Sequence, residues 1–171
     1  QMSKDVLYVD ADEKIIGSGS ISNAVENGII VRIARIFLTN SKNELLIQKR
    51  SPTVRSVPNR WDQTAAGHVD ADESFDTAAA RELQEEMGIT GVELNLLTKY
   101  YTEETDEELT KKRFNAIYTG VYNGEVSIDH DEVSDYAWVS QESLVNRMKS
   151  DPNEYTDGFV EAYNKYLEGA K

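Results

Sequence analysis

The chain has 171 residues, contains no cysteine, and carries 31 acidic against 18 basic side chains, for a formal net charge of -13. This length suits one core, and no change in composition marks a boundary, so residues 1–171 are expected to form one domain. The charge argues against binding to nucleic acids or anionic membranes. The lack of cysteine excludes disulfides and thiol nucleophiles, and no apolar run is long enough to span a bilayer, so a soluble cytoplasmic protein is expected.

The first predicted elements are two short strands around a polar turn. Residues 5–9 (DVLYV) and 15–20 (IIGSGS) predict a β-hairpin, within an N-terminal cover over residues 1–25. An exposed hairpin of this kind could mediate a homodimer. The apolar, β-branched segments at 28–38 and 45–48 follow, and they predict two paired core strands.

A basic loop comes next. Residues 49–61 (KRSPTVRSVPNRW) hold four cations and no acid, and two prolines keep them out of regular structure. The functional interpretation is a phosphate-binding loop, with Arg50 and Arg60 as ligands and Trp61 as a stacking surface. The alternative is a solvated loop with Trp61 in the core.

An acidic helix is predicted after this loop. Ser74 is its candidate N-cap and Gly88 lies just past its end. Glu82, Glu85 and Glu86 share one face of the helix, although like charges at this spacing repel and the helix dipole is negative at this end. A divalent metal would supply the missing positive charge, so the helix is expected to form a metal site.

The C-terminal half predicts strands and then helices. Residues 92–101 and 113–122 are expected to be strands, joined by a solvated acidic loop at 102–112. A last strand is predicted at 135–139, followed by helices within residues 141–168.

The segment at residues 67–89 resembles the Nudix box. It fills every fixed position of that motif: Gly67, Glu73, Arg81, Glu82, Leu83, Glu85, Glu86, Gly88 and Ile89. Nine defined positions within 23 residues make a specific match. The resemblance implies an α/β (α+β) fold, an α/β/α sandwich in which a mixed β-sheet lies between helices and the box forms a loop-helix-loop metal site.

The resemblance also implies a ligand set. Glu82, Glu85 and Glu86 would bind the metal, with the carbonyl oxygen of Gly67 as a further ligand. Ligands that are all oxygen suit Mg²⁺ or Mn²⁺. In such a site a water molecule could lose its proton near neutral pH and attack phosphorus.

Other residues would support this chemistry. Arg81 can hold Glu85 and pair with Glu73, so both are expected to position the ligands, and Arg81 is also counted with the catalytic residues. The general base could be Glu82, Glu85 or a downstream acid, for which Glu132 is the candidate. The sequence does not choose among them.

The residues around the start of the box are similar to those of isopentenyl diphosphate isomerases, a branch with the same fold. The matching positions are Trp61, Thr64, Ala66, Gly67 and His68. The catalytic cysteine of that branch is replaced by Ala66, and its upstream histidine ligands have no counterpart. Because alanine has no proton to transfer, isomerisation is not expected.

The expected function is therefore metal-dependent hydrolysis of the pyrophosphate linkage in a nucleoside diphosphate derivative. Two alternatives are an isopentenyl diphosphate isomerase and a Nudix-fold sensor that binds a nucleotide without cleaving it. The sensor is disfavoured because such proteins typically lose acids of the box, whereas this box is complete.

Overall fold

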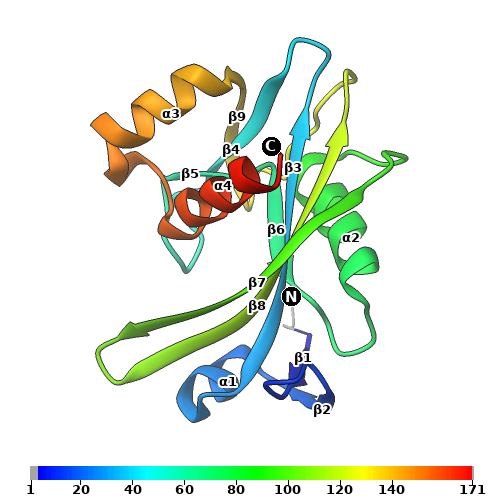
Figure 1. The fold of residues 1–171 in the computed structure, drawn as a ribbon, viewed down its shortest axis with the longest axis vertical. Coiled ribbons are helices and arrows are strands. Elements are labelled where there is room, and N and C mark those ends of the chain that lie inside the picture. The colour runs from blue at the N-terminus through cyan, green and yellow to red at the C-terminus, as the bar shows by residue number, and fades with distance from the viewer. Residues whose placement is uncertain (1–3, 171) are drawn as a thin grey trace.

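The computed structural model describes residues 4–170 (Figure 1). Its elements, in chain order, are β1 (Val6–Val9), β2 (Ile15–Gly19), α1 (Ile21–Asn27), β3 (Ile30–Thr39), β4 (Glu44–Arg50), β5 (Trp61–Asp62), β6 (Ala65–His68), α2 (Phe75–Met87), β7 (Asn95–Asp106), β8 (Leu109–Val121), β9 (Val133–Ser140), α3 (Gln141–Ser150), the 3₁₀ helix η1 (Pro152–Glu154) and α4 (Asp157–Gly169). No helix of this described part is long and apolar enough to cross a bilayer.

Strand β3 is the centre of a nine-stranded mixed sheet. One edge of β3 pairs in parallel with β8 along its whole length. Its other edge is shared in turn by β1, β6 and β4, all antiparallel. The β-branched and apolar residues of β3 suit a strand that is buried on both faces. This pairing fixes β6, which carries the start of the Nudix-like segment, against the middle of the sheet.

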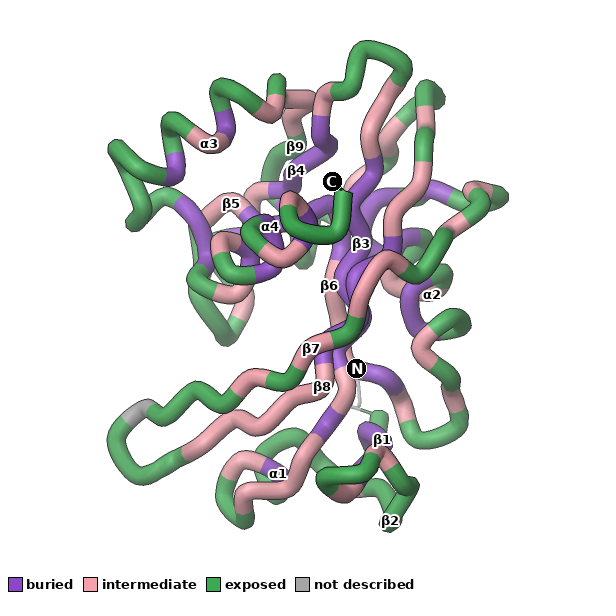
Figure 2. Tube along the Cα trace, in the orientation of Figure 1, coloured by how far each residue is buried: buried purple, intermediate pink, exposed green. Residues whose placement is uncertain are grey.

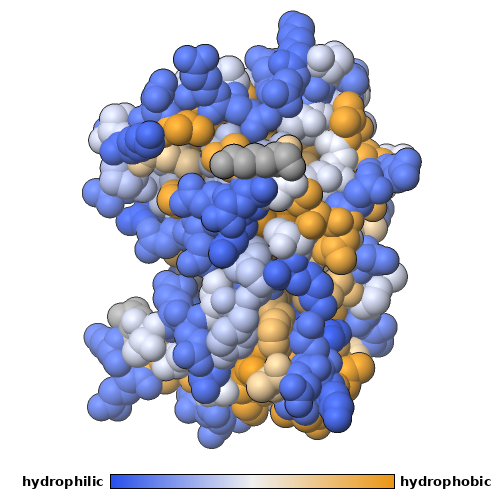
Figure 3. All heavy atoms as spheres, in the orientation of Figure 1, coloured by the Kyte–Doolittle hydropathy of each residue, from blue (hydrophilic) through white to orange (hydrophobic). Residues whose placement is uncertain are grey.

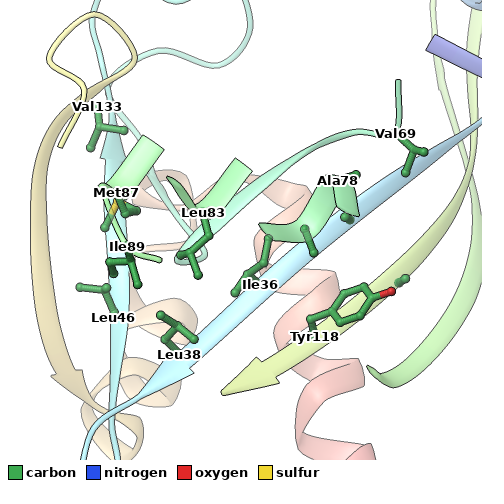
Figure 4. Packing of buried hydrophobic residues seen from close by; sticks show 14 of the residues in the cluster. Ile36, Leu38, Leu46, Val69, Ala78, Leu83, Met87, Ile89, Tyr118 and Val133 are labelled. Atoms are coloured by element: carbon green, nitrogen blue, oxygen red, sulfur yellow. The ribbon is translucent and has the colours of Figure 1, made fainter. Parts of the chain in front are cut away.

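Alternate residues of β3 point to opposite faces of the sheet. Ile36 and Leu38 pack in a cluster with Leu83 and Met87 of α2 (Figure 4). Phe37 packs on the other side, in a second cluster formed mainly with α3 and α4. Helices therefore cover both faces of a mixed sheet, and the predicted α/β/α sandwich is confirmed.

The boundaries of α2 follow from local capping. The Ser74 hydroxyl accepts a hydrogen bond from the Thr77 N–H, and the Thr77 hydroxyl accepts one from the Ser74 N–H. At the other end Gly88 has a φ of 65° and donates its N–H to the carbonyl oxygen of Gln84. The predicted helix is confirmed at both ends.

The N-terminal cover contains a helix that the sequence analysis did not predict. The hairpin of β1 and β2 is present, but Ile21–Asn27 form α1, capped by Ser20 and ended by Gly28 at a φ of 63°. The prediction of a hairpin alone over residues 1–25 was wrong for this part, and residues 1–3 lie outside the described residues. Only one residue of the helix, Ala24, is buried, so its apolar periodicity is weak.

The prediction of a solvated acidic loop at 102–112 was also wrong. Strands β7 and β8 continue through it as an antiparallel hairpin with a tight turn, where Glu107 has a φ of 55°. Glu103 lies opposite Lys112 and Glu104 opposite Lys111, and such cross-strand pairs of opposite charge offset the repulsion among the acids. The hairpin projects from the body and is largely exposed (Figure 2).

Truncation of Phe37 to alanine is expected to lower the free energy of unfolding by about 3–5 kcal/mol. Its ring is completely buried and lies against Phe159, Tyr163 and Tyr166. Urea denaturation monitored by circular dichroism measures the change. Leu96→Ala is the control, because Leu96 is 52% exposed. Equal losses in the two variants would contradict the packing described for Phe37.

Candidate active site

The guanidinium of Arg81 joins four carboxylates beside the start of α2. Its Nε and Nη2 donate to both oxygens of Glu73, at 2.6 and 2.7 Å. Its Nη1 donates to Glu82 at 2.7 Å and to Glu85 at 3.3 Å, and Nη2 lies 3.5 Å from Asp70. Nη2 also donates to the carbonyl oxygen of His68 on β6. Arg81 therefore ties the acidic face of α2 to the strand beside it, the positioning arrangement predicted for Glu73 and Arg81.

Gly67 leaves room for the carboxyl group of Glu82. A Cβ atom at position 67 would collide with that carboxyl group, so no other residue would fit without displacing it. Glu86 is buried, and its Oε1 accepts a hydrogen bond from Nε2 of Gln48 at 2.7 Å. Gln48 in turn donates to the carbonyl oxygen of Thr64 at 3.0 Å. The backbone of β6 and the side chain from β4 thus hold two of the three predicted metal ligands.

The carboxyl groups of Glu82 and Glu86 shift each other's pKa in opposite directions. Burial raises the pKa of Glu86 well above its ordinary value, and the hydrogen bond with Glu82 and the Glu82 charge raise it further. Burial also raises the pKa of Glu82, whereas its hydrogen bond with Glu86 lowers it. Of the two carboxyl groups, Glu86 therefore holds a proton more readily. Such a proton would compensate a charge that a bound cation could compensate instead.

Glu85 and Glu132 lie at the solvent side of the acidic group. The Glu85 side chain is 54% exposed. Partial desolvation raises the pKa of Glu132, and the charges of Glu82 and Glu85 add to this shift while Arg50 opposes it. Glu132 is therefore within the electrostatic field of the box acids. This position is compatible with the role proposed for it from sequence, as a downstream acid or base.

The donor groups fit a hard divalent cation, because they are carboxylate and carbonyl oxygens alone. Among residues 4–170, however, no three acidic or histidine side chains already converge at metal-ligand distances. In this structure Glu82 and Glu85 contact Arg81 instead. Binding of a metal by Glu82, Glu85 and Glu86 would draw carboxylates away from Arg81.

A basic cavity of about 290 Å³ lies across β6 from the acids. Ala66 and His68 line it from β6, and their β3 partners Arg35 and Ile33 line it from the same face of the sheet. The loop after β4, the start of α4 and the β7–β8 hairpin form its other walls. Figure 3 shows the molecule indented at this side, between the hairpin and the body. Its cationic lining residues are Arg35, Arg50, Arg60, Lys111 and Arg113.

Three of these cations were missed by the sequence analysis. Arg35 is buried, and its Nε and Nη1 donate to the neutral amides of Asn115 and Gln63, at 3.0 and 3.1 Å. Within the described residues, Arg35, Lys111 and Arg113 have no carboxylate within ion-pairing distance, although Glu104 lines the same cavity and lies opposite Lys111 across the hairpin. Burial and the charge of Arg35 lower the pKa of Arg113, against the opposing charge of Glu104. Buried and partly buried cations that form no direct ion pair mark an anion-binding site.

The three residues predicted for substrate binding are not all brought to this cavity. Arg50 and Arg60 both line it, and Arg50 Nη1 also lies 3.2 Å from Asp62 Oδ2. Trp61 is not among the lining residues. Its side chain packs against the second core cluster, with the Lys49 ammonium 5.9 Å from the ring centroid. The predicted stacking surface is therefore a core contact, which was the alternative considered from sequence.

Comparison with known protein families identifies this arrangement. The model of the NUDIX domain matches residues 30–159, so the chain belongs to the Nudix family. A solved structure from Deinococcus radiodurans superposes with a TM-score of 0.79 at 20% identity, covering 95% of this chain and 98% of that one. This likeness shows that the two chains share the fold.

Two curated relatives belong to different functional classes. An isopentenyl-diphosphate Δ-isomerase of Serratia proteamaculans is 29% identical over 160 residues, 93% of this chain and 89% of the relative. A prenyl-diphosphate phosphatase of Methanosarcina mazei is 32% identical over 174 residues, 95% of this chain and 99% of the relative. The predicted isomerase-like branch of the Nudix superfamily is confirmed.

Replacement of Arg81 by glutamine is expected to destabilise the fold at pH 7 by about 2 kcal/mol, because the partly buried carboxylates of Asp70, Glu73 and Glu82 lose their counterion. Arg81 lowers the pKa of Glu73, so the stability that Glu73 adds is present at neutral pH and is lost as the pH falls below its ordinary value of 4.5. The difference between wild type and variant should therefore shrink in acid. Urea unfolding at pH 7 and pH 4 measures it.

The control is Arg147→Gln, because Arg147 forms only an exposed pair with Glu154 at 3.8 Å. A destabilisation by Arg81→Gln that is the same at both pH values would contradict this electrostatic account.

Proposed function

We propose that this chain is a metal-dependent hydrolase that cleaves the phosphoanhydride bond of a small diphosphate compound. One observation supports it above the others. The acids of the Nudix box lie on one side of β6, and on the other side lies a cavity whose five cations, Arg35, Arg50, Arg60, Lys111 and Arg113, outnumber its three acids, Asp62, Glu104 and Asp157. A diphosphate placed at the edge of β6 would meet the cations with its outer oxygens and the metal-binding acids with the bridging group.

Nudix hydrolases generally use divalent metals. Here Glu82, Glu85, Glu86 and the Gly67 carbonyl would hold Mg²⁺ or Mn²⁺, which supplies Lewis-acid activation of water and neutralises charge on the phosphoryl oxygens. Arg81 keeps the carboxylates within reach of one another. Glu132, or one of the box acids, accepts the proton from water.

The basic cavity binds and orients the diphosphate. Arg35 and Arg113 approach it from neighbouring strands, and Arg50 and Arg60 approach from the loop after β4. Guanidinium groups suit this task because they bind phosphate oxygens with two parallel hydrogen bonds and remain charged when partly buried.

The substrate class is open between two kinds of diphosphate. A nucleoside diphosphate derivative is the expectation from the sequence, and a prenyl diphosphate is suggested by the name of the Methanosarcina relative. Isomerisation is less well supported, although several relatives carry that name. Ala66 lines the basic cavity at the position where that branch has its cysteine. The chain contains no cysteine, so no thiol is present to move a proton.

Replacement of Glu86 by glutamine is expected to lower turnover of the best diphosphate substrate by about 100-fold or more, because a buried metal ligand is lost. Without metal the variant should be at least as stable as wild type. Glutamine is close in shape to the protonated Glu86 and can still accept the hydrogen bond from Gln48. Addition of Mg²⁺ should raise the melting temperature of wild type but not of the variant.

Phosphate release and thermal denaturation with and without Mg²⁺ test both parts of this prediction. Glu108→Gln, an exposed acid in the β7–β8 turn, is the control. Unchanged turnover in Glu86→Gln would contradict the proposed function. A ligand that binds tightly and is recovered intact with Mg²⁺ would point to a sensor instead.

Replacement of Arg113 by glutamine is expected to raise KM about tenfold or more, the cost of one charged hydrogen bond to phosphate. The Mg²⁺-induced rise in melting temperature should be kept, because Arg113 lies across β6 from the box acids. Steady-state kinetics and thermal denaturation measure the two effects, with Arg147→Gln as the control. A loss of the Mg²⁺ response with an unchanged KM would contradict the assignment.

A further inference from the structure

A second cavity opens directly beside the basic one. It has a volume of about 330 Å³ and lies between α1, the start of β3 and β8. Ser56, His68, Lys111 and Arg113 line both cavities. A small molecule held by the cations of the basic cavity could therefore extend into the second cavity without leaving the protein.

The wall that α1 and β3 give to this second cavity is largely aliphatic, whereas the remaining lining is polar or charged: Lys4, Asp5, Ser20, Ser22, Arg55, Ser56, His68, Thr110, Lys111, Lys112 and Arg113. Its apolar members are Ile21, Ala24, Val25, Ile29 and Val31. Val31 stands on the same face of β3 as Ile33 and Arg35, which line the basic cavity. Along this face of β3 the side chains therefore change from aliphatic at Val31 to cationic at Arg35.

His68 stands at the boundary between the two cavities. It lines both cavities, and on β6 it pairs with Ile33 of β3, which lies between Val31 of the aliphatic wall and Arg35 of the basic cavity.

We propose that the second cavity holds the hydrocarbon part of a diphosphate ester whose diphosphate lies in the basic cavity. This rests on the proposed function, because it takes the basic cavity to be the diphosphate site. A nucleoside in the same place would set ring nitrogens and hydroxyls against aliphatic side chains, at the cost of hydrogen bonds to water. An alkyl or prenyl chain has no such cost, and the cavity lies within the range of about 300–1,000 Å³ typical of small-ligand sites.

Binding can be measured without turnover by using diphosphate analogues with a non-hydrolysable methylene bridge. Isothermal titration with Mg²⁺ would compare a methyl and a five-carbon prenyl ester of methylenediphosphonate. Each buried methylene is worth about fourfold in affinity, so the prenyl ester should bind at least about tenfold more tightly. The prenyl alcohol alone serves as the control for non-specific hydrophobic binding and should not compete.

Val25 offers the variant for this test, because it lines the cavity from α1 and is only half-buried. Val25→Asp should weaken binding of the prenyl ester about tenfold and leave the methyl ester unchanged, since it places a charge against the chain. Val25→Phe, which narrows the cavity from the α1 side, should reduce the preference for the longer chain. Val121→Asp and Val121→Phe are the matched controls, because Val121 lies at the far end of β8 and is 65% exposed.

Equal affinity of wild type for the two esters would overturn this inference, and so would equal effects of the Val25 and Val121 variants. The corresponding hydrolysable diphosphates test the proposed function separately. If the prenyl preference in binding is found but no diphosphate is cleaved, the cavity assignment stands and hydrolysis fails. If nucleoside diphosphate derivatives are cleaved and the Val25 variants match wild type, hydrolysis stands and the cavity assignment fails.

Discussion

The site depends on how Arg81 neutralises the acids around it. One guanidinium compensates Asp70, Glu73, Glu82 and Glu85, and burial beside Glu82 raises the pKa of Glu86, a fifth carboxyl group. Removal of Arg81 would leave the negative charges of these partly buried carboxylates uncompensated. The same network lets α2 carry its acids on one face, because their mutual repulsion is offset before any metal arrives.

The alternation of side chains in β3 and β6 separates this acidic group from the basic cavity. Ala34 and Gly67 are paired and face α2, whereas Arg35 and Ala66, the next pair, face the cavity. Arg35 is thus kept on the opposite face of the sheet from Glu82. Direct ion pairing between them would satisfy both groups and leave neither for a ligand.

Local sequence patterns made the acidic helix and the core strands predictable. The caps at Ser74 and Gly88, the spacing of the box acids and the alternation of the core strands all depend on neighbours in sequence. Arg35 and Arg113 were not predicted as site residues, because their meeting depends on the parallel pairing of β3 with β8, whose segments are about 80 residues apart. The acidic stretch at 102–112 misled for a different reason, since its repulsion is offset by Lys111 and Lys112, which lie within the stretch and face its acids across a tight turn.

The overall charge sets a further constraint on what the cavity can bind. A chain of net charge -13 repels a free diphosphate at long range, although salt screens this repulsion beyond about 8 Å. Affinity must therefore come from short-range contacts with Arg35, Arg113 and the loop arginines, and from burial of whatever the diphosphate is attached to. An apolar attachment is unaffected by the field of the protein, whereas each further negative group would add to the repulsion. A singly attached, uncharged hydrocarbon chain meets this constraint better than a second phosphate or a phosphorylated ribose.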